Sequence, residues 1–156
     1  MVTAYRMCQK MRASEAFPGE GSKKKGMRWN NKDIPVVYVA AHLSLAALEI
    51  IVNFPRKALG VPFVFFKVEI PESVKIANVG PLPVDWRDFP YQTSTQDIGS
   101  QWALDGKTAV LEVPSAVIPE ERNYILNPLH SDFKKIVISP AKDFQFDNRL
   151  YTDNLS

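Results

Sequence analysis

The stretch "PVVYVAAHLSLAALEIIVNFP", residues 35–55, carries the pattern that decides the fold. Its opening run, 35–40, is rich in β-branched and aromatic residues and predicts a buried strand. The run "LSLAALEIIV" that follows predicts a buried helix, with Ser44 as its cap. The helix should run to about Phe54, because Pro55 cannot continue it. A strand that leads directly into a buried helix is therefore the first expected unit.

One charge interrupts this helix. Residues 43–52 are apolar at eight of ten positions, and Glu49 lies among them. On a helical wheel Glu49 falls between Leu45 and Val52, so no rotation of the helix places it on a polar face. A buried carboxylate must take up a proton or find a cation and hydrogen-bond donors. Glu49 is therefore either structural, as an ion pair or at a helix end emerging into solvent near Asn53, or catalytic at a pocket edge.

The rest of the chain predicts a mixture of strands and few helices. A long loop with glycines and prolines is expected at 14–35, and an extended proline-rich connection at 79–92. A second helix is expected from the capping signals Ser94 or Thr95, Asp97 in its first turn, and Gly106 just past its end. Further strands are expected at 3–10, 61–71, 108–119 and 134–146. Irregular spacing of these elements favours an α+β fold over a doubly wound parallel sheet.

Composition indicates an ordinary globular domain. The chain has 156 residues, of which 46% are hydrophobic and 23% charged, and we expect one domain over 1–156. No apolar run is long enough to span a bilayer, and no secretory signal is recognisable, so we expect a cytoplasmic protein that binds no membrane. Cys8 is the only cysteine, which excludes an intrachain disulfide.

Charge and histidine content narrow the function classes. The net charge of +2 is small, and the basic run 23–25 lies in the predicted loop, so we expect no direct nucleic-acid binding. His42 and His130 lack the spacing of metal ligands, and we predict no metal. No G-x-G-x-x-G follows a strand, so a dehydrogenase's way of holding NAD is not expected.

Three further residues suggest a ligand site. Arg28 in "GMRWN" offers a rigid fork for carboxylate or phosphate beside an aromatic ring. Arg6 lies in an apolar strand context, and Tyr38 lies in the strand that leads to Glu49. Together with Glu49, these side chains indicate a site for an anionic ligand that carries a sugar.

The sequence resembles the RES-domain toxins of bacterial RES–Xre toxin–antitoxin pairs, named for an arginine, a glutamate and a serine. In this chain Met27 stands where the family usually has a second glycine. The resemblance covers nearly the whole chain, in order, in "YR" (5–6), "AFPGEGSKKKGMRWN" (16–30), "VVYVAAHLSLAALEIIVNF" (36–54), "PLPVDWRDFP" (81–90), "IGSQWALDGKTAVLEVPSAVIPEERNYILNPLHSDFKKI" (98–136) and "FQFDNRL" (144–150).

The resemblance implies a compact domain similar to the diphtheria-toxin-like ADP-ribosyltransferases, with NAD⁺ as substrate and no cofactor. It implies catalytic roles for Glu49, Arg28 and Tyr38. It also implies NAD⁺ contacts by a larger set, which comprises Arg6, Arg28, Tyr38, Ser115, Asn123 and Asn127. Arg28 and Arg6 would hold the pyrophosphate, and Arg28 could also pair with Glu49 in the empty pocket.

The same resemblance implies a toxin that depletes NAD⁺ and arrests growth, and that an Xre-type antitoxin binds and blocks. The acceptor of the ADP-ribose stays open among water, phosphate and a host protein, so an ADP-ribosyltransferase is the alternative within this class. A non-enzymatic protein- or RNA-binding module is the alternative outside it. A homodimer is also left open.

Overall fold

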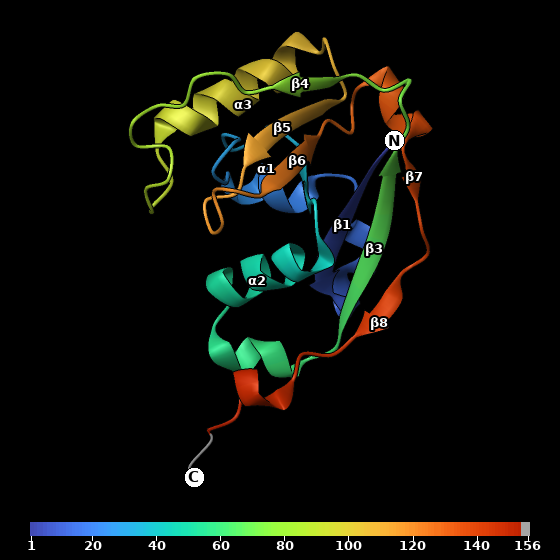
Figure 1. Ribbon diagram of the computed structural model, residues 1–156, viewed down its shortest axis with the longest axis vertical. Helices are drawn as coiled ribbons and strands as arrows, with labels where there is room; N and C mark the ends of the chain where they lie inside the picture. Colours follow the sequence, from blue (N-terminus) through green and yellow to red (C-terminus); the bar gives the residue numbers. More distant parts are fainter. Residues whose placement is uncertain (154–156) are drawn as a thin grey trace.

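The computed structural model describes residues 1–153, and the strands of this range form one eight-stranded sheet (Figure 1). The strand order is β4-β5-β6-β2-β1-β3-β7, and β8 also pairs with β3. Neighbouring strands are antiparallel except β4 and β5. The strands are β1 Val2–Gln9, β2 Val37–Ala40, β3 Phe63–Ile70, β4 Ile76–Asn78, β5 Val110–Pro114, β6 Arg122–Leu126, β7 Val137–Ile138 and β8 Lys142–Phe144.

Residues 1–153 also form three α-helices and four short 3₁₀ helices. Figure 1 shows α3 beside β4 at one end of the molecule and α2 near the middle, where α2 contacts β1 and β2. The helices are α1 Glu20–Lys25, α2 Leu43–Asn53 and α3 Thr93–Asp105, and the 3₁₀ turns are η1 Lys10–Glu15, η2 Arg56–Gly60, η3 Ser131–Lys135 and η4 Asn148–Leu150.

The sheet divides into two halves at the β1–β2 junction. β1 and β2 share a single registered pair, Tyr5 with Ala40. By contrast, β1 pairs with β3 along its whole length, from Val2 opposite Ile70 to Gln9 opposite Phe63. The α2 helix covers this junction, because its buried Leu45 packs with Met7, Ala40 and Phe63 in one hydrophobic cluster.

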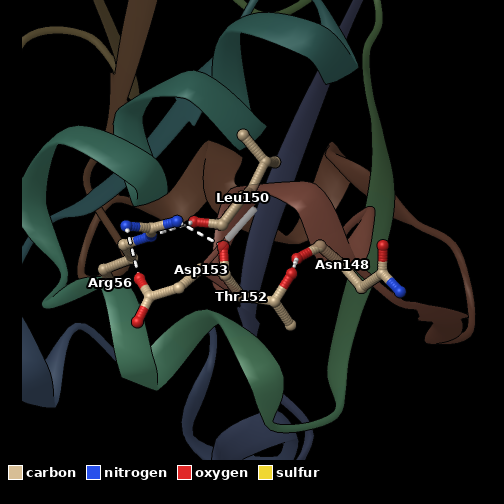
Figure 2. A network of polar contacts seen from close by, with 5 residues as sticks. All are labelled: Arg56, Asn148, Leu150, Thr152 and Asp153. Carbon is tan, nitrogen blue, oxygen red and sulfur yellow. Dashed lines mark hydrogen bonds and ion pairs between the residues drawn. The ribbon is translucent and has the colours of Figure 1, made fainter. Parts of the chain in front are cut away.

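The last described residues are tied back to η2 by one arginine (Figure 2). Arg56 Nε donates to the Leu150 carbonyl at 3.2 Å, and Nη1 donates to Asp153 Oδ1 at 3.3 Å. Arg56 Nη2 also donates to the Thr152 carbonyl, and the Thr152 hydroxyl donates to the Asn148 carbonyl at 2.7 Å. These contacts hold η4 against η2 at the end of the molecule opposite α3 (Figure 1).

The strand–helix unit predicted at 35–55 is confirmed as β2 and α2. The predicted cap is wrong, because the first helical turn bonds to the His42 carbonyl, 3.0 Å from the Ala46 nitrogen, and His42 is the N-cap. Phe54 is extended, as expected of a residue before proline. The helix therefore begins before Ser44 and ends where the sequence indicated.

The second helix predicted from the sequence is α3, and here too the predicted end is right and the predicted cap is wrong. It ends at Asp105 before Gly106, as predicted. Its N-cap is Gln92, however, and neither Ser94 nor Thr95 caps it, which also moves Asp97 out of the first turn. Neither N-cap, His42 of α2 or Gln92 of α3, forms a side-chain capping hydrogen bond. The serine and threonine residues that predicted such caps do not act as caps.

The segment 14–35 differs from the predicted loop, because it contains the end of η1 and all of α1. The basic run 23–25 forms the last turn of α1. Ser22 is the only buried residue of α1, so the sequence has no hydrophobic periodicity there from which the helix could be predicted. β4 and β6 were also not predicted, since β4 is very short and β6 begins with an arginine and an asparagine.

Candidate functional site

A cleft lies between α2, the turn after α1, the segment before α3 and the β5–β6 loop. Its larger cavity has a volume of about 280 Å³ and its smaller cavity about 170 Å³. Both cavities are lined by a common set of residues, which comprises Met27, Tyr38, Glu49, Asn53 and Asn123. The carboxylate singled out in the sequence therefore faces both parts of the cleft.

Glu49 is half-buried on α2 and is held by two neutral donors. Ser115 Oγ donates to its Oε1 at 2.8 Å, and Asn123 Nδ2 donates to the same oxygen at 2.9 Å. No lysine, arginine or histidine among residues 1–153 lies within 4.0 Å of the carboxylate. The expected pairing of Glu49 with Arg28 is therefore wrong for this structure, and the negative charge remains available to a ligand.

Ser115 is oriented by its own loop. Its hydroxyl accepts hydrogen bonds from the backbone nitrogens of Val117 and Ile118, each at 3.1 Å. A hydroxyl has one proton and two acceptor lone pairs. Because the two amides occupy the lone pairs, the proton points to Glu49.

Arg28 is fixed against the segment that precedes α3. Its Nη1 donates to the carbonyls of Trp86 at 2.7 Å and Asp88 at 2.8 Å. Its Cζ lies 5.2 Å from the centre of the Tyr91 ring. Burial lowers the pKa of Arg28, while Tyr91, Glu49, Tyr38 and Asp88 act in the opposite direction. These contacts use only Nη1, so Nε and Nη2 can donate hydrogen bonds to an anion.

The turn that carries Arg28 is locked against α3. Met27 and Asn30 form an isolated bridge, and the buried Asn30 side chain donates to three carbonyls around it. The backbone nitrogen of Asn31 donates to Ser100 Oγ at 2.8 Å. A Cβ at Gly99 would lie 1.7 Å from the Trp29 carbonyl oxygen, so only glycine permits this approach.

Tyr38 holds the same turn from the other side. Its hydroxyl donates to Asn30 Oδ1 at 2.6 Å and accepts from the Trp29 backbone nitrogen at 3.1 Å. Burial raises the pKa of Tyr38 far above its ordinary value, so the phenol stays neutral. With its hydroxyl engaged, Tyr38 offers the cleft its ring rather than a hydrogen bond.

Arg6 lines only the smaller cavity, at the β1–β2 junction. Its Nη1 donates to the Tyr38 carbonyl at 3.0 Å, and its Cζ lies 6.0 Å from the centre of the Phe17 ring. Within the described chain its buried Nε has no hydrogen-bond partner, and the same holds for Asn123 Oδ1. Burial lowers the pKa of Arg6. Arg6 and Asn123, which both line the smaller cavity, thus each keep one buried polar atom unpaired among residues 1–153.

Two residues predicted to contact NAD⁺, Ser115 and Asn127, do not line either cavity. Ser115 is fully buried behind Glu49 and lines neither cavity. Asn127 is also buried and lines neither cavity, because its amide donates to the Ala103 carbonyl at 3.1 Å and accepts from the Leu129 nitrogen at 3.0 Å. In this structure Ser115 therefore orients Glu49, and Asn127 stabilises the turn that follows β6.

Sequence reasoning missed Arg87 and Tyr91, which line the larger cavity, and Asn30, which supports it. Arg87 and its neighbours stand in "PLPVDWRDFP", where an arginine between an aromatic residue and an aspartate within a proline-rich connection was a usable signal. Asn30 offered none, since its importance depends on burial inside a turn.

The histidines lie outside the cleft. His42 Nε2 is 3.9 Å from an oxygen of Glu121 at an exposed position, and His130 Nδ1 accepts from the Asp132 nitrogen at 2.9 Å. Over residues 1–153, no three histidine, cysteine, aspartate or glutamate side chains gather where they could hold a metal ion. In the same range no helix has both the length and the hydropathy that crossing a bilayer requires.

Comparison with known proteins gives a consistent result. The family model described as the RES domain matches residues 3–147. The chain is 38% identical over 148 residues to "Toxin Res" of Photorhabdus laumondii, which covers 94% of this chain and 95% of that protein. It is 35% identical over 157 residues to the "Prs ADP-ribosylating toxin" of Sphingobium sp., with 96% and 98% covered.

A solved structure shares the fold. The crystal structure of the MbcT–MbcA toxin–antitoxin complex of M. tuberculosis contains a chain that superposes with a TM-score of 0.74 at 17% identity. The match covers 92% of this chain and 84% of that one. The predicted α+β fold is thereby confirmed.

Proposed function

The chain belongs to the RES domain family, and on that basis we propose that it is the toxin of a toxin–antitoxin pair and cleaves NAD⁺ at the nicotinamide–ribose bond. Two relatives that span nearly the whole chain are named toxins, and one of them is named as ADP-ribosylating. These names support the class of activity.

One observation carries the proposal: Glu49, Arg28 and Arg87 line the same cavity, and neither arginine lies within 4.0 Å of a carboxylate of the described residues. The cleft therefore offers separated negative and positive charges. In NAD⁺ the nicotinamide ring is cationic and the pyrophosphate is anionic. The ring would therefore complement Glu49, and the pyrophosphate would complement the arginines.

Cleavage of this bond does not require a general acid. The C1′–N bond breaks, its electron pair passes to the pyridine nitrogen, and nicotinamide leaves as a neutral molecule. Positive charge develops on the ribose as the bond breaks. Glu49 would stabilise that charge, and Ser115 and Asn123 would keep the carboxylate in place without neutralising it.

The remaining cleft residues would bind and orient the substrate. Arg28 would bind phosphate oxygens through the nitrogens that its contacts with Trp86 and Asp88 leave available. Tyr38 would present its ring to the nicotinamide. Arg6, which lines the smaller cavity, would supply a further positive charge. NAD⁺ is the substrate, and the proposal involves no cofactor.

The acceptor of the ADP-ribose defines two forms of this activity. An oxygen of water or phosphate bonds to C1′ and releases a proton, which gives ADP-ribose or its 1″-phosphate. A protein side chain gives the transferase reaction instead. The relative named "Prs ADP-ribosylating toxin" favours the transferase as the second candidate.

We also propose that an Xre-type antitoxin binds this chain and blocks its cleft. The structural neighbour was solved as a toxin–antitoxin complex, and the relatives' names agree with such a pair. An inactive complex formed on co-expression, and restored turnover once the antitoxin is removed, would support this part of the proposal.

The direct test is to incubate the purified protein with NAD⁺, with and without phosphate, and to identify the products by mass. Nicotinamide with ADP-ribose, or with its 1″-phosphate, is expected. If neither appears, cell lysate supplies protein acceptors, and ADP-ribose attached to a protein is then expected. No nicotinamide release under any of these conditions would contradict the proposal and favour a non-enzymatic binding module.

A further inference from the structure

Arg87 lies between β4 and α3 and lines the larger cavity together with Arg28 and Glu49. Its side chain is exposed, yet its Nε donates to the Ala116 carbonyl at 2.7 Å. Ala116 directly follows Ser115, the residue that orients Glu49. The guanidinium is therefore anchored at one nitrogen on the loop that supports the carboxylate.

The outer nitrogens of Arg87 have no acceptor among the described residues. Within residues 1–153, Nη1 and Nη2 of Arg87 donate no hydrogen bond, and no carboxylate lies within 4.0 Å of the guanidinium. An arginine fixed through Nε presents the edge that binds an oxyanion through two parallel hydrogen bonds.

Arg28 is held by the backbone on either side of Arg87. Trp86 and Asp88, the two residues that flank Arg87, give their carbonyls to Arg28 Nη1. Both arginines thus line the same cavity, and neither has a carboxylate of residues 1–153 within 4.0 Å. A pyrophosphate, with two adjacent charged groups, matches a pair of guanidiniums.

We propose that Arg87 binds the pyrophosphate of the dinucleotide substrate, alongside Arg28. This inference rests on the proposed function and assigns a binding residue that sequence reasoning did not identify. It requires that Arg87 contribute to affinity for ligands with phosphate groups, and not to affinity for the nicotinamide riboside part alone.

A purely structural role must be separated from binding, because Arg87 also braces the Ala116 loop. Arg56 provides the matched control, since its guanidinium likewise donates to backbone carbonyls but lines neither cavity (Figure 2). Arg56→Gln should lower thermal stability without changing ligand affinity. Nicotinamide riboside, which has no phosphate, provides the matched control ligand.

The experiment measures binding of ADP-ribose and nicotinamide riboside by calorimetry in a Glu49→Gln background, where neither probe is consumed. Adding Arg87→Gln should weaken ADP-ribose binding by about tenfold or more and leave riboside binding unchanged. Adding Arg87→Lys should restore part of the affinity, because the charge returns without the fork.

Three results would overturn the inference. Unchanged ADP-ribose binding in Arg87→Gln would show that Arg87 does not touch the phosphates. An equal loss for both probes would show a structural role. If the unmodified protein neither binds ADP-ribose nor releases nicotinamide from NAD⁺, the proposed function fails as well, whereas the first two results leave it intact.

Discussion

The hydroxyl of Ser115 has its single proton directed at Glu49, 2.8 Å away, because two backbone amides occupy its lone pairs. The serine therefore acts through the glutamate and does not itself face the cleft. This relationship joins the β5–β6 loop to α2, which lie far apart in the sequence.

Ser115→Ala should reduce both stability and turnover. It leaves the Val117 and Ile118 amides without their acceptor, at a cost of about 1–3 kcal/mol in the free energy of unfolding. Glu49 loses one of its two donors, and NAD⁺ turnover should fall by roughly 100-fold through misorientation. Denaturant unfolding and nicotinamide release measure the two effects. Ser44→Ala on exposed helix surface is the control, and an active Ser115→Ala would contradict the assignment.

Glu49→Gln should separate charge from structure. The amide oxygen can still accept from Ser115 and Asn123, so the melting temperature should change little. Turnover should fall by roughly 10²- to 10³-fold, because the group that stabilises the ribose cation is now neutral. Toxicity on expression in cells should disappear in parallel. Full toxicity in this variant would exclude Glu49 from the chemistry.

Tyr38→Phe should weaken the turn that carries Arg28. The substitution removes the acceptor of the Trp29 amide and the donor to Asn30, at a cost of about 1–3 kcal/mol. The ring remains, so a rise in KM for NAD⁺ is expected with a smaller change in kcat. The pKa of Tyr38 is raised by burial, so its ionisation should not shape the pH–rate profile between pH 6 and 9. An unchanged KM would argue against this role.

Gly99→Ala should disturb the contact between α3 and the Arg28 turn. The new Cβ would meet the Trp29 carbonyl at 1.7 Å, so the helix or the turn must shift, at a cost of about 1–3 kcal/mol. Gly21→Ala is the matched control, because a Cβ there meets nothing within 4 Å and should stabilise α1 slightly. Thermal unfolding of both variants gives the comparison. Equal melting temperatures would show that the close approach is not needed.

The sequence predicted the central unit of the fold because its signals are local. The composition of 35–40 predicted β2, the apolar residues of 43–52 predicted α2, and Pro55 predicted where α2 ends. Both elements appear where expected. Helix α1 was missed because it buries only Ser22 and owes its place to contacts with other parts of the chain, such as the Ser22 hydroxyl with the Val36 carbonyl. A contact of this kind produces no hydrophobic periodicity in the sequence, so it cannot be predicted from the pattern of residues.

For the site, the sequence identified side chains more readily than their partners. Glu49 was recognisable as a charge in an apolar helix, and Arg28 and Tyr38 by their neighbours. Which donors meet Glu49 depends on how β5, β6 and α2 assemble, and the structure places Ser115 and Asn123 there. Asn127 and Asn123 are both asparagines of the β6 region, and only the structure separates them.

The single residue pair between β1 and β2 has a mechanical consequence. Residues on both sides of that pair, Arg6 on one strand and Tyr38 on the other, line the smaller cavity. A small rotation of one half of the sheet against the other would change the width of this cavity while each half keeps its own ladder of hydrogen bonds. The Arg6–Tyr38 contact crosses the same boundary, so a group that occupies the smaller cavity would alter how the two halves of the sheet sit against each other.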